Sequence, residues 1–176
     1  MSTAVAIIGA GPLGRRLALL AARAGCRVLL EDVMPANLHH ARESLRLELG
    51  PAALPAVIFV STIEDAVRDA DLAIDCVPDE LESKLEIFCL LDRMAPPRTV
   101  LATPTTRLSI TDLAACTYRA DKCVAIAAEA ASITGSDGSE VLLRTALQTA
   151  PQTVALVENF WRQIGFKPRF EPDPLA

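Results

Sequence analysis

The sequence predicts an α/β fold with a doubly wound, mostly parallel sheet. Short apolar runs of strand length alternate along the chain with longer amphipathic stretches of helix length, an order typical of parallel sheets. Hydrophobic residues make up 51% of the 176 residues and aromatic residues only 4%, so we expect an aliphatic core. A chain of this length is expected to form one domain, residues 1–176.

The first predicted unit is a strand, a glycine-rich turn and a helix. The apolar run at residues 5–8 leads directly into Gly9-Ala10-Gly11-Pro12-Leu13-Gly14, and an amphipathic stretch follows at residues 17–23. A G-x-G-x-x-G loop in this context favours dinucleotide binding, because the start of the helix attracts the pyrophosphate. Gly9 permits the turn, Gly11 lets the backbone approach the phosphates, and Gly14 lets helix and strand pack closely. We expect Gly9, Gly11, Pro12, Leu13 and Gly14 to contact the dinucleotide.

The second predicted strand, residues 26–30, ends in the acidic pair Glu31-Asp32. A carboxylate about 20 residues beyond the glycine loop is where the adenosine ribose hydroxyls are bound. Asp32 fits this role best, and the alternative is a solvated acidic turn. Between Asp32 and Arg42 the sequence has no Arg or Lys to neutralise a 2′-phosphate. The expected cofactor is therefore NAD rather than NADP.

The remaining elements continue the alternation. Helices are predicted at residues 35–49, 63–68, 80–93 and 151–164, and a capping box at residues 109–112 starts one more. Strands are predicted at residues 56–60, 72–76, 99–102, 123–127 and 167–170. Together with the first unit, these elements predict a Rossmann-type sheet covered by helices on both faces.

Composition excludes several other classes of function. The net charge of −5 argues against nucleic acid as a partner. The five cysteines have no metal-ligand spacing, so no metal is expected, and those in or beside the strand-like runs, Cys26, Cys76 and Cys123, are predicted to be buried free thiols. Neither a basic leader nor an apolar run of membrane-spanning length occurs, which favours a cytoplasmic protein that does not bind membranes.

In order, these segments resemble the N-terminal NAD-binding domain of the L-3-hydroxyacyl-CoA dehydrogenases. The resemblance covers almost the whole chain. It is carried by residues 5–14, Asp32-Val33, ADLAIDCVPDELESK at residues 70–84, LATPTTRLSIT at residues 101–111 and IGFKP at residues 164–168. The two middle stretches are more specific than the glycine loop, because other nucleotide-binding families lack them. The resemblance implies an NAD-binding Rossmann fold.

The same resemblance implies further site residues. Val77 falls in the cofactor-binding stretch, and Asp79 takes the position of a cofactor-proximal acid that is glutamate in the family. Lys84 matches a lysine near the nicotinamide and the substrate, and Thr106 keeps a hydroxyl at the position of a serine that contacts substrate. For Asp79 and Lys84 the alternative is a solvated first turn of a helix, where an acid is favoured by the helix dipole.

The match fails at the catalytic residues. The family's catalytic histidine stands at the end of the strand that corresponds to residues 123–127, in a run H-F-F-N-P. Here that run is Ala127-Ala128-Glu129-Ala130-Ala131, and Pro104 replaces a family asparagine. Alanine cannot accept the proton that alcohol oxidation releases. Glu140 lies near the family glutamate that orients the histidine, and Glu129 is the nearest alternative base. His39 and His40 are expected on a solvated helix face.

Three hypotheses follow from this pattern. The chain is an NAD(H)-binding module without the dehydrogenase activity, or a dehydrogenase subunit completed by a partner chain or a second copy, or an interaction protein that no longer binds cofactor. The glycine loop and Asp32 argue against the third hypothesis, and Ala127 argues against the second. Acyl-CoA is expected to bind only with a partner chain.

In the family, the last strand leads into a helical domain that binds the acyl chain and dimerises. This sequence ends at residue 176, so that domain is expected to be missing. A homodimer is expected in its place, with Phe160, Trp161 and Phe166 as apolar surface to be covered. The alternative is that Trp161 belongs to the core.

Overall fold

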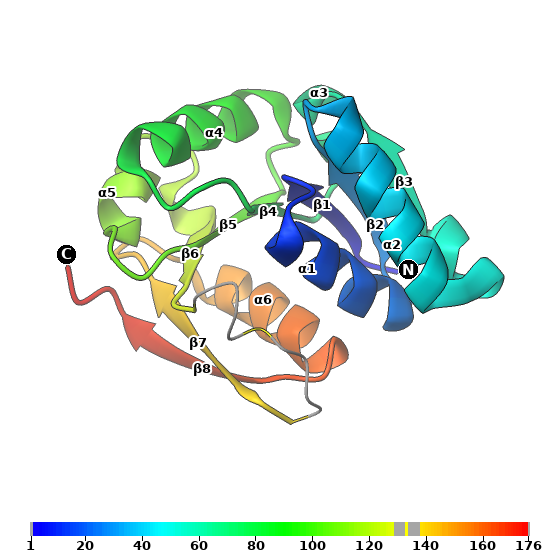
Figure 1. Ribbon diagram of the computed structural model, residues 1–176. Coiled ribbons are helices and arrows are strands. Elements are labelled where there is room, and N and C mark those ends of the chain that lie inside the picture. The colour runs from blue at the N-terminus through cyan, green and yellow to red at the C-terminus, as the bar shows by residue number, and fades with distance from the viewer. Residues whose placement is uncertain (1, 129–132, 134–137, 176) are drawn as a thin grey trace.

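The computed structural model describes residues 2–128, 133 and 138–175 (Figure 1). Its strands are β1 (Ala4–Ile8), β2 (Arg27–Glu31), β3 (Val57–Val60), β4 (Leu72–Asp75), β5 (Val100–Pro104), β6 (Cys123–Ile126), β7 (Glu140–Thr145) and β8 (Lys167–Pro172). Its helices are α1 (Pro12–Arg23), α2 (Pro35–Ala53), α3 (Ile63–Val67), α4 (Leu81–Met94), α5 (Ile110–Ala115) and α6 (Pro151–Gln163), with 3₁₀ turns η1 (Leu54–Ala56) and η2 (Ala120–Lys122).

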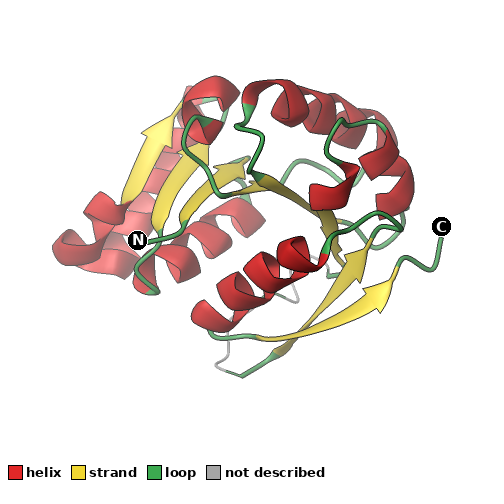
Figure 2. Cartoon of the chain, turned by 180° about the vertical axis from the view of Figure 1, so that it is seen from behind, coloured by secondary structure: helices red, strands yellow, loops and turns green. Residues whose placement is uncertain are grey.

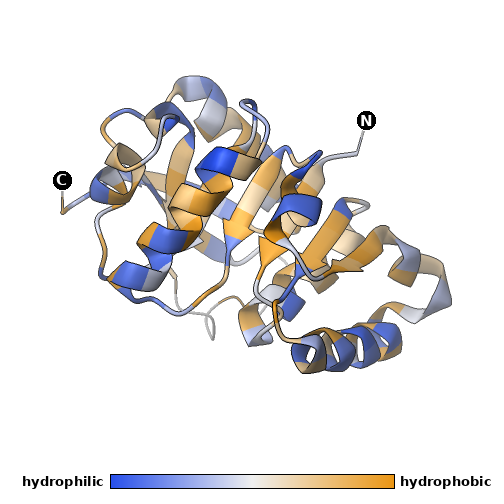
Figure 3. Ribbon diagram, turned by 90° about the horizontal axis from the view of Figure 1, so that it is seen from above, coloured by the Kyte–Doolittle hydropathy of each residue, from blue (hydrophilic) through white to orange (hydrophobic). Residues whose placement is uncertain are grey.

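Helices cover both faces of the sheet, as predicted. Along β1, Val5 and Ile7 face a core formed with α1, α2 and α6, whereas Ala6 and Ile8 face a second core formed with α3, α4 and α5. Figures 1 and 2 show these two helix layers from opposite sides. In Figure 3 the strands are coloured hydrophobic between helices of mixed colour. Strands buried on both faces explain the continuous apolar runs of the sequence.

The sheet has the order β3-β2-β1-β4-β5-β6-β7-β8. Strands β1 to β6 are parallel to one another, β7 is antiparallel to β6, and β8 is parallel to β7. The prediction of a doubly wound, mostly parallel sheet is therefore confirmed. Strand β7 was not predicted; it is a six-residue strand that starts and ends with polar residues and buries Val141 and Leu143.

The aromatic side chains of the C-terminal part are not a surface. Phe160, Trp161 and Phe166 are each at most 4% exposed and pack edge to face, with ring centroids 5.8 and 5.2 Å apart. They fill the core between α6 and the sheet. The expectation that these three residues present apolar surface was wrong, and the alternative that Trp161 belongs to the core is correct.

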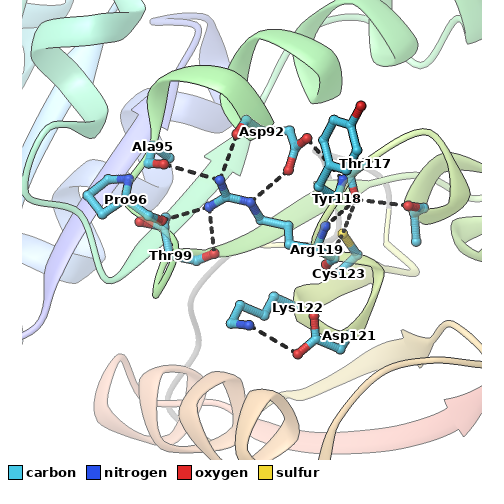
Figure 4. Close-up of polar contacts among 11 residues, drawn as sticks. Asp92, Ala95, Pro96, Thr99, Thr117, Tyr118, Arg119, Asp121, Lys122 and Cys123 are labelled. Carbon is cyan, nitrogen blue, oxygen red and sulfur yellow. Dashed lines mark hydrogen bonds and ion pairs between the residues drawn. The ribbon is translucent and has the colours of Figure 1, made fainter.

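Arg119 ties the segment before β6 to the end of α4 (Figure 4). Its guanidinium uses all five N–H groups: Nε donates to the Asp92 carboxylate at 2.8 Å, and the two Nη atoms donate to the carbonyls of Asp92, Ala95, Pro96 and Thr99. Arg119 is 8% exposed. The last carbonyls of a helix have no partner within the helix, and here an arginine from another segment supplies their donors.

Arg119→Lys should lower the free energy of unfolding by about 2 kcal/mol. An ammonium has three donors at one point and cannot reach all the acceptors that the planar guanidinium reaches, so buried carbonyls lose their partners. Urea denaturation followed by circular dichroism measures the change. Arg68→Lys, at an exposed ion pair with Asp65, is the matched control, with an expected change below about 0.5 kcal/mol. Equal effects of the two substitutions would contradict this role of Arg119.

Candidate functional site

The glycine loop forms the turn between β1 and α1. Gly9 has φ +107°, a conformation that favours glycine, and its N–H donates to the Glu31 carbonyl at 2.8 Å. A Cβ on Gly14 would overlap the Gly9 carbonyl oxygen, so the helix lies directly against the turn. A Cβ on Gly11 would meet no described atom within 4 Å. Gly11 therefore faces open space, whereas Gly9 and Gly14 are closely surrounded.

Helix α1 offers free donors at this turn. Gly11 is its N-cap and provides no side-chain acceptor, and Pro12 occupies a first-turn position where the missing N–H costs nothing. The first turn holds no acidic residue that would neutralise the positive end of the helix dipole. This end of α1 is suited to an anion such as a pyrophosphate.

A cavity of about 780 Å³ opens over the glycine loop. It lies at the carboxyl ends of the parallel strands, next to β1 and β4, where the strand order reverses and where such sheets bind ligands. The volume is within the range of small-molecule sites. The residues lining it are Gly9, Gly11, Pro12, Leu13, Asp32, Asn37, Cys76, Val77, Pro78, Asp79, Pro104, Thr105, Thr106, Arg107 and Ala128.

Asp32 forms one wall of the cavity and is 9% exposed. Its Oδ2 accepts from the Ala10 N–H at 2.9 Å, and its Oδ1 accepts from the Met34 N–H at 2.8 Å. The Asn37 amide donates to both oxygens at 3.1 Å. The neighbouring Glu31 is buried, and burial together with the Asp32 charge raises its pKa to about 7. Asp32 thus holds the glycine loop and the start of α2 together.

Asp79 joins two loops at another part of the cavity wall. Its Oδ2 accepts from the Thr106 N–H at 3.3 Å, and its carbonyl accepts from the Arg107 guanidinium at 3.0 Å. The buried Oδ1 of Asp79 has no hydrogen-bond partner among the described residues. The Thr105 hydroxyl closes the second loop by accepting from the N–H groups of Arg107 and Leu108. The structure therefore brings together Asp79 and Thr106, which the resemblance singled out separately.

Lys84 lies behind the cavity wall rather than in the described lining. Its ammonium contacts Asp75 Oδ2 and the Val77 carbonyl, each at 3.1 Å, and both charged side chains are at most 1% exposed. Asp75 also accepts from the Val77 N–H and the Thr103 hydroxyl, each at 2.9 Å. Burial raises the pKa of Asp75, and Lys84 and the hydrogen bonds lower it in part. The alternative of a solvated Lys84 was wrong: the pair clamps both backbone groups of Val77, which lines the cavity.

Two alanines, Ala127 and Ala128, follow directly after β6. The Ala127 N–H donates to the Leu142 carbonyl at 2.8 Å and so continues the contact between β6 and β7. Ala128 lines both the large cavity and a smaller one of about 200 Å³, whereas Ala127 and Glu140 line the smaller one alone. Glu129 lies outside the described residues. His39 and His40 are exposed on α2, as expected.

The part of the chain that the structure describes holds neither a candidate metal site nor a candidate membrane-spanning helix. No group of three His, Cys, Asp or Glu side chains there could hold a metal ion. No described helix has the length and apolar character needed to cross a membrane. Cys26 and Cys123 are buried free thiols, as predicted, and Cys76 is partly buried at the cavity wall, where burial raises the pKa of its thiol.

The cavity wall also includes residues that the sequence did not single out as site residues, Asn37 and Arg107 among them. Asn37 stands in the first turn of α2, five residues beyond Asp32, and this short spacing from the ribose-binding candidate was the available signal. Arg107 stands directly after Thr106, in a stretch that carries the family resemblance. Both side chains resemble ordinary solvated residues until the fold places them beside the cavity.

The fold and the cavity define a dinucleotide-binding protein of the Rossmann type. The family model for the NAD-binding domain of 3-hydroxyacyl-CoA dehydrogenase matches residues 4–168. The chain belongs to the 3-hydroxyacyl-CoA dehydrogenase family, and the matched region is its NAD-binding domain. Its cofactor is NAD.

Relatives of known activity are similar along most of the chain. A 5-formyl-3-hydroxy-2-methylpyridine 4-carboxylate 5-dehydrogenase of Mesorhizobium japonicum is 30% identical, over 93% of this chain and 55% of the relative. An L-carnitine dehydrogenase of Burkholderia mallei is 32% identical, over 93% of this chain and 53% of the relative. The chain thus spans about half the length of these relatives.

Solved structures agree on the fold. The (S)-3-hydroxybutyryl-CoA dehydrogenase of Ralstonia eutropha superposes with a TM-score of 0.87 at 25% identity, over 96% of this chain and 63% of that one. The crystal structure of a 5-formyl-3-hydroxy-2-methylpyridine 4-carboxylic acid 5-dehydrogenase, described as an NAD⁺-dependent dismutase, gives 0.84 at 30% identity, over 98% of this chain and 59% of that one.

Proposed function

We propose that this chain is an NAD(H)-binding module of its family that does not catalyse the family's alcohol oxidation. The observation that carries the proposal is the end of β6, where Ala127 and Ala128 stand in the run that holds the catalytic histidine of the family. Ala128 lines the large cavity, and the described lining contains no imidazole. A general base at the reacting hydroxyl is what alcohol oxidation requires, and a methyl group cannot provide it.

In this proposal each part of the cavity wall has a role in binding. The first turn of α1, with Gly11, Pro12 and Leu13, binds the pyrophosphate. Asp32 accepts from the adenosine ribose hydroxyls. Val77, Asp79 and Thr106 contact the nicotinamide half, and Lys84 positions Val77 through its carbonyl. Bound NAD supplies a hydride acceptor at its nicotinamide ring.

The chain of 176 residues should show no turnover of 3-hydroxyacyl-CoA. Without the base, a rate contribution of about 10²–10⁴-fold is lost. The assay follows NADH absorbance with acetoacetyl-CoA and longer 3-ketoacyl-CoAs, and NADH fluorescence in the same samples verifies that the chain is loaded. Robust turnover would mean that Asp79, Glu129 or Glu140 acts as the base, and the binding-module proposal would have to be abandoned.

NAD should bind at least about 10-fold more tightly than NADP. A 2′-phosphate would approach the Asp32 carboxylate, and like charges about 4 Å apart repel by several kcal/mol near a protein surface. Calorimetric titration with both cofactors measures the ratio. Asp32→Asn keeps an acceptor for the Ala10 N–H but removes the charge, so the ratio should fall toward one. Equal affinity of the unchanged chain for both cofactors would rule out this role of Asp32.

A second candidate is a dehydrogenase subunit completed by a partner chain or by a second copy, with acyl-CoA bound only in the complex. It is favoured by the relatives, which are dehydrogenases about twice as long as this chain. A homodimer would be one form of it, although the buried aromatic residues no longer support one. Light scattering at high concentration tests the homodimer form, which a monomer would contradict.

A further inference from the structure

The Asn37 amide is hydrogen-bonded to the Asp32 carboxylate, which in the proposed function binds the adenosine ribose. Its Nδ2 lies 3.1 Å from both Asp32 oxygens, and Asn37 and Asp32 line the same cavity. The side chain is exposed and reaches back from the first turn of α2. The amide therefore contacts both oxygens of Asp32 at the wall of the cavity.

The acceptor capacity of Asp32 is already filled. An ionised carboxylate offers about four lone-pair sites. Two are taken by the N–H groups of Ala10 and Met34, and two by the Asn37 amide. The Ala10 and Met34 donors belong to the backbone and move only with the glycine loop or the start of α2. The amide of Asn37 is on a rotatable side chain, so it can leave without any backbone movement.

We propose that Asn37 sets the affinity for NAD by competing with the adenosine ribose for Asp32. The ribose diol donates to the carboxylate after the Asn37 amide has turned into solvent, and the lost contact weakens the observed affinity. The inference rests on the proposed role of Asp32. Asn37 is thus a residue that tunes cofactor binding rather than one that contacts the reacting atoms.

Removing the competitor should tighten binding. An exposed hydrogen bond of this kind changes an equilibrium by about 3–10-fold, so Asn37→Ala should lower the Kd for NAD by that factor. Calorimetric titration of the full chain measures it. His40→Ala, an exposed substitution on the same helix that does not line the cavity, is the matched control and should leave the Kd unchanged.

A second pair of probes isolates the ribose. Asn37→Ala should improve the binding of ADP by about the same factor as that of NAD, but not the binding of 2′,3′-dideoxyadenosine diphosphate, which lacks the diol. An unchanged or weaker Kd for NAD in Asn37→Ala would overturn the inference alone, as would an equal gain for both diphosphates. Absence of NAD binding by the unchanged chain would overturn the proposed function and this inference with it.

Discussion

Gly14→Ala should destabilise the folded chain by about 3 kcal/mol and abolish NAD binding. The added Cβ overlaps the Gly9 carbonyl oxygen and comes within 3.3 Å of an Ile7 methyl carbon. Because the main clash is with backbone, no side-chain rotation relieves it, and α1 must move away from β1. Urea denaturation gives the stability change, and calorimetry gives the loss of NAD binding.

Gly11→Val is the matched substitution, which should abolish NAD binding without changing the stability of the fold. Gly11 has φ −66° and ψ −175°, which any residue adopts, and its Cβ would meet no described atom within 4 Å. Stability should stay within about 0.5 kcal/mol, as at other sites without a packing defect. NAD binding should be lost, because the isopropyl group occupies the space through which the phosphates approach. Normal NAD binding by Gly11→Val would refute this placement of the pyrophosphate, and a stable Gly14→Ala would refute the tight turn.

Lys84→Met should cost about 3–5 kcal/mol of stability at neutral pH. It leaves the Asp75 carboxylate fully buried without its countercharge, and an uncompensated buried charge is strongly destabilising. Burial raises the pKa of Asp75, and Lys84 counteracts this rise. Without Lys84 the pKa of Asp75 in the folded chain is therefore higher still. The unfolded chain then releases the Asp75 proton at a lower pH than the folded chain. The loss of stability therefore grows as pH rises above about 4, the usual pKa of Asp, and shrinks below it.

The double variant Asp75→Leu/Lys84→Met separates charge from packing. Replacing a whole buried ion pair by apolar side chains is often neutral, so this variant should recover most of the stability lost in Lys84→Met. Thermal and urea unfolding of the three chains at two pH values test both parts. A Lys84→Met chain as stable as the parent at neutral pH would show that the pair contributes nothing to the fold.

The sequence predicted the elements with strong local signals. The glycine loop and the apolar runs identified the strands from β1 to β6, since strands buried on both faces need no alternation with polar residues. Strand β7 was not predicted because Glu140 and Arg144 flank an apolar run of only three residues, and its partner β6 lies antiparallel to it. Such pairing is decided by tertiary contacts, which a local pattern does not contain.

Site residues, too, were predictable only where they lie within one local unit of the chain. Spacing located Asp32 and the glycines beside one another because these residues belong to a single strand–turn–helix–strand unit, from β1 to the end of β2. Lys84 resembled a solvated residue in the first turns of a helix, and its partner Asp75 was hidden in a strand-like run. Their contact crosses from β4 to α4 and needs the folded chain. Asn37 likewise reaches Asp32 only because the chain turns between β2 and α2.

The five-donor contact of Arg119 has a consequence for how the chain opens. It joins segments that lie 20–27 residues apart in sequence, and the Tyr118 N–H adds a bond to the Asp92 carboxylate although the Tyr118 ring is fully exposed. Neither segment can detach without breaking the bonds of the other. We therefore expect the end of α4 and the approach to β6 to form one cooperative unit for local unfolding, whose amide protons exchange with solvent through a common opening of one free energy.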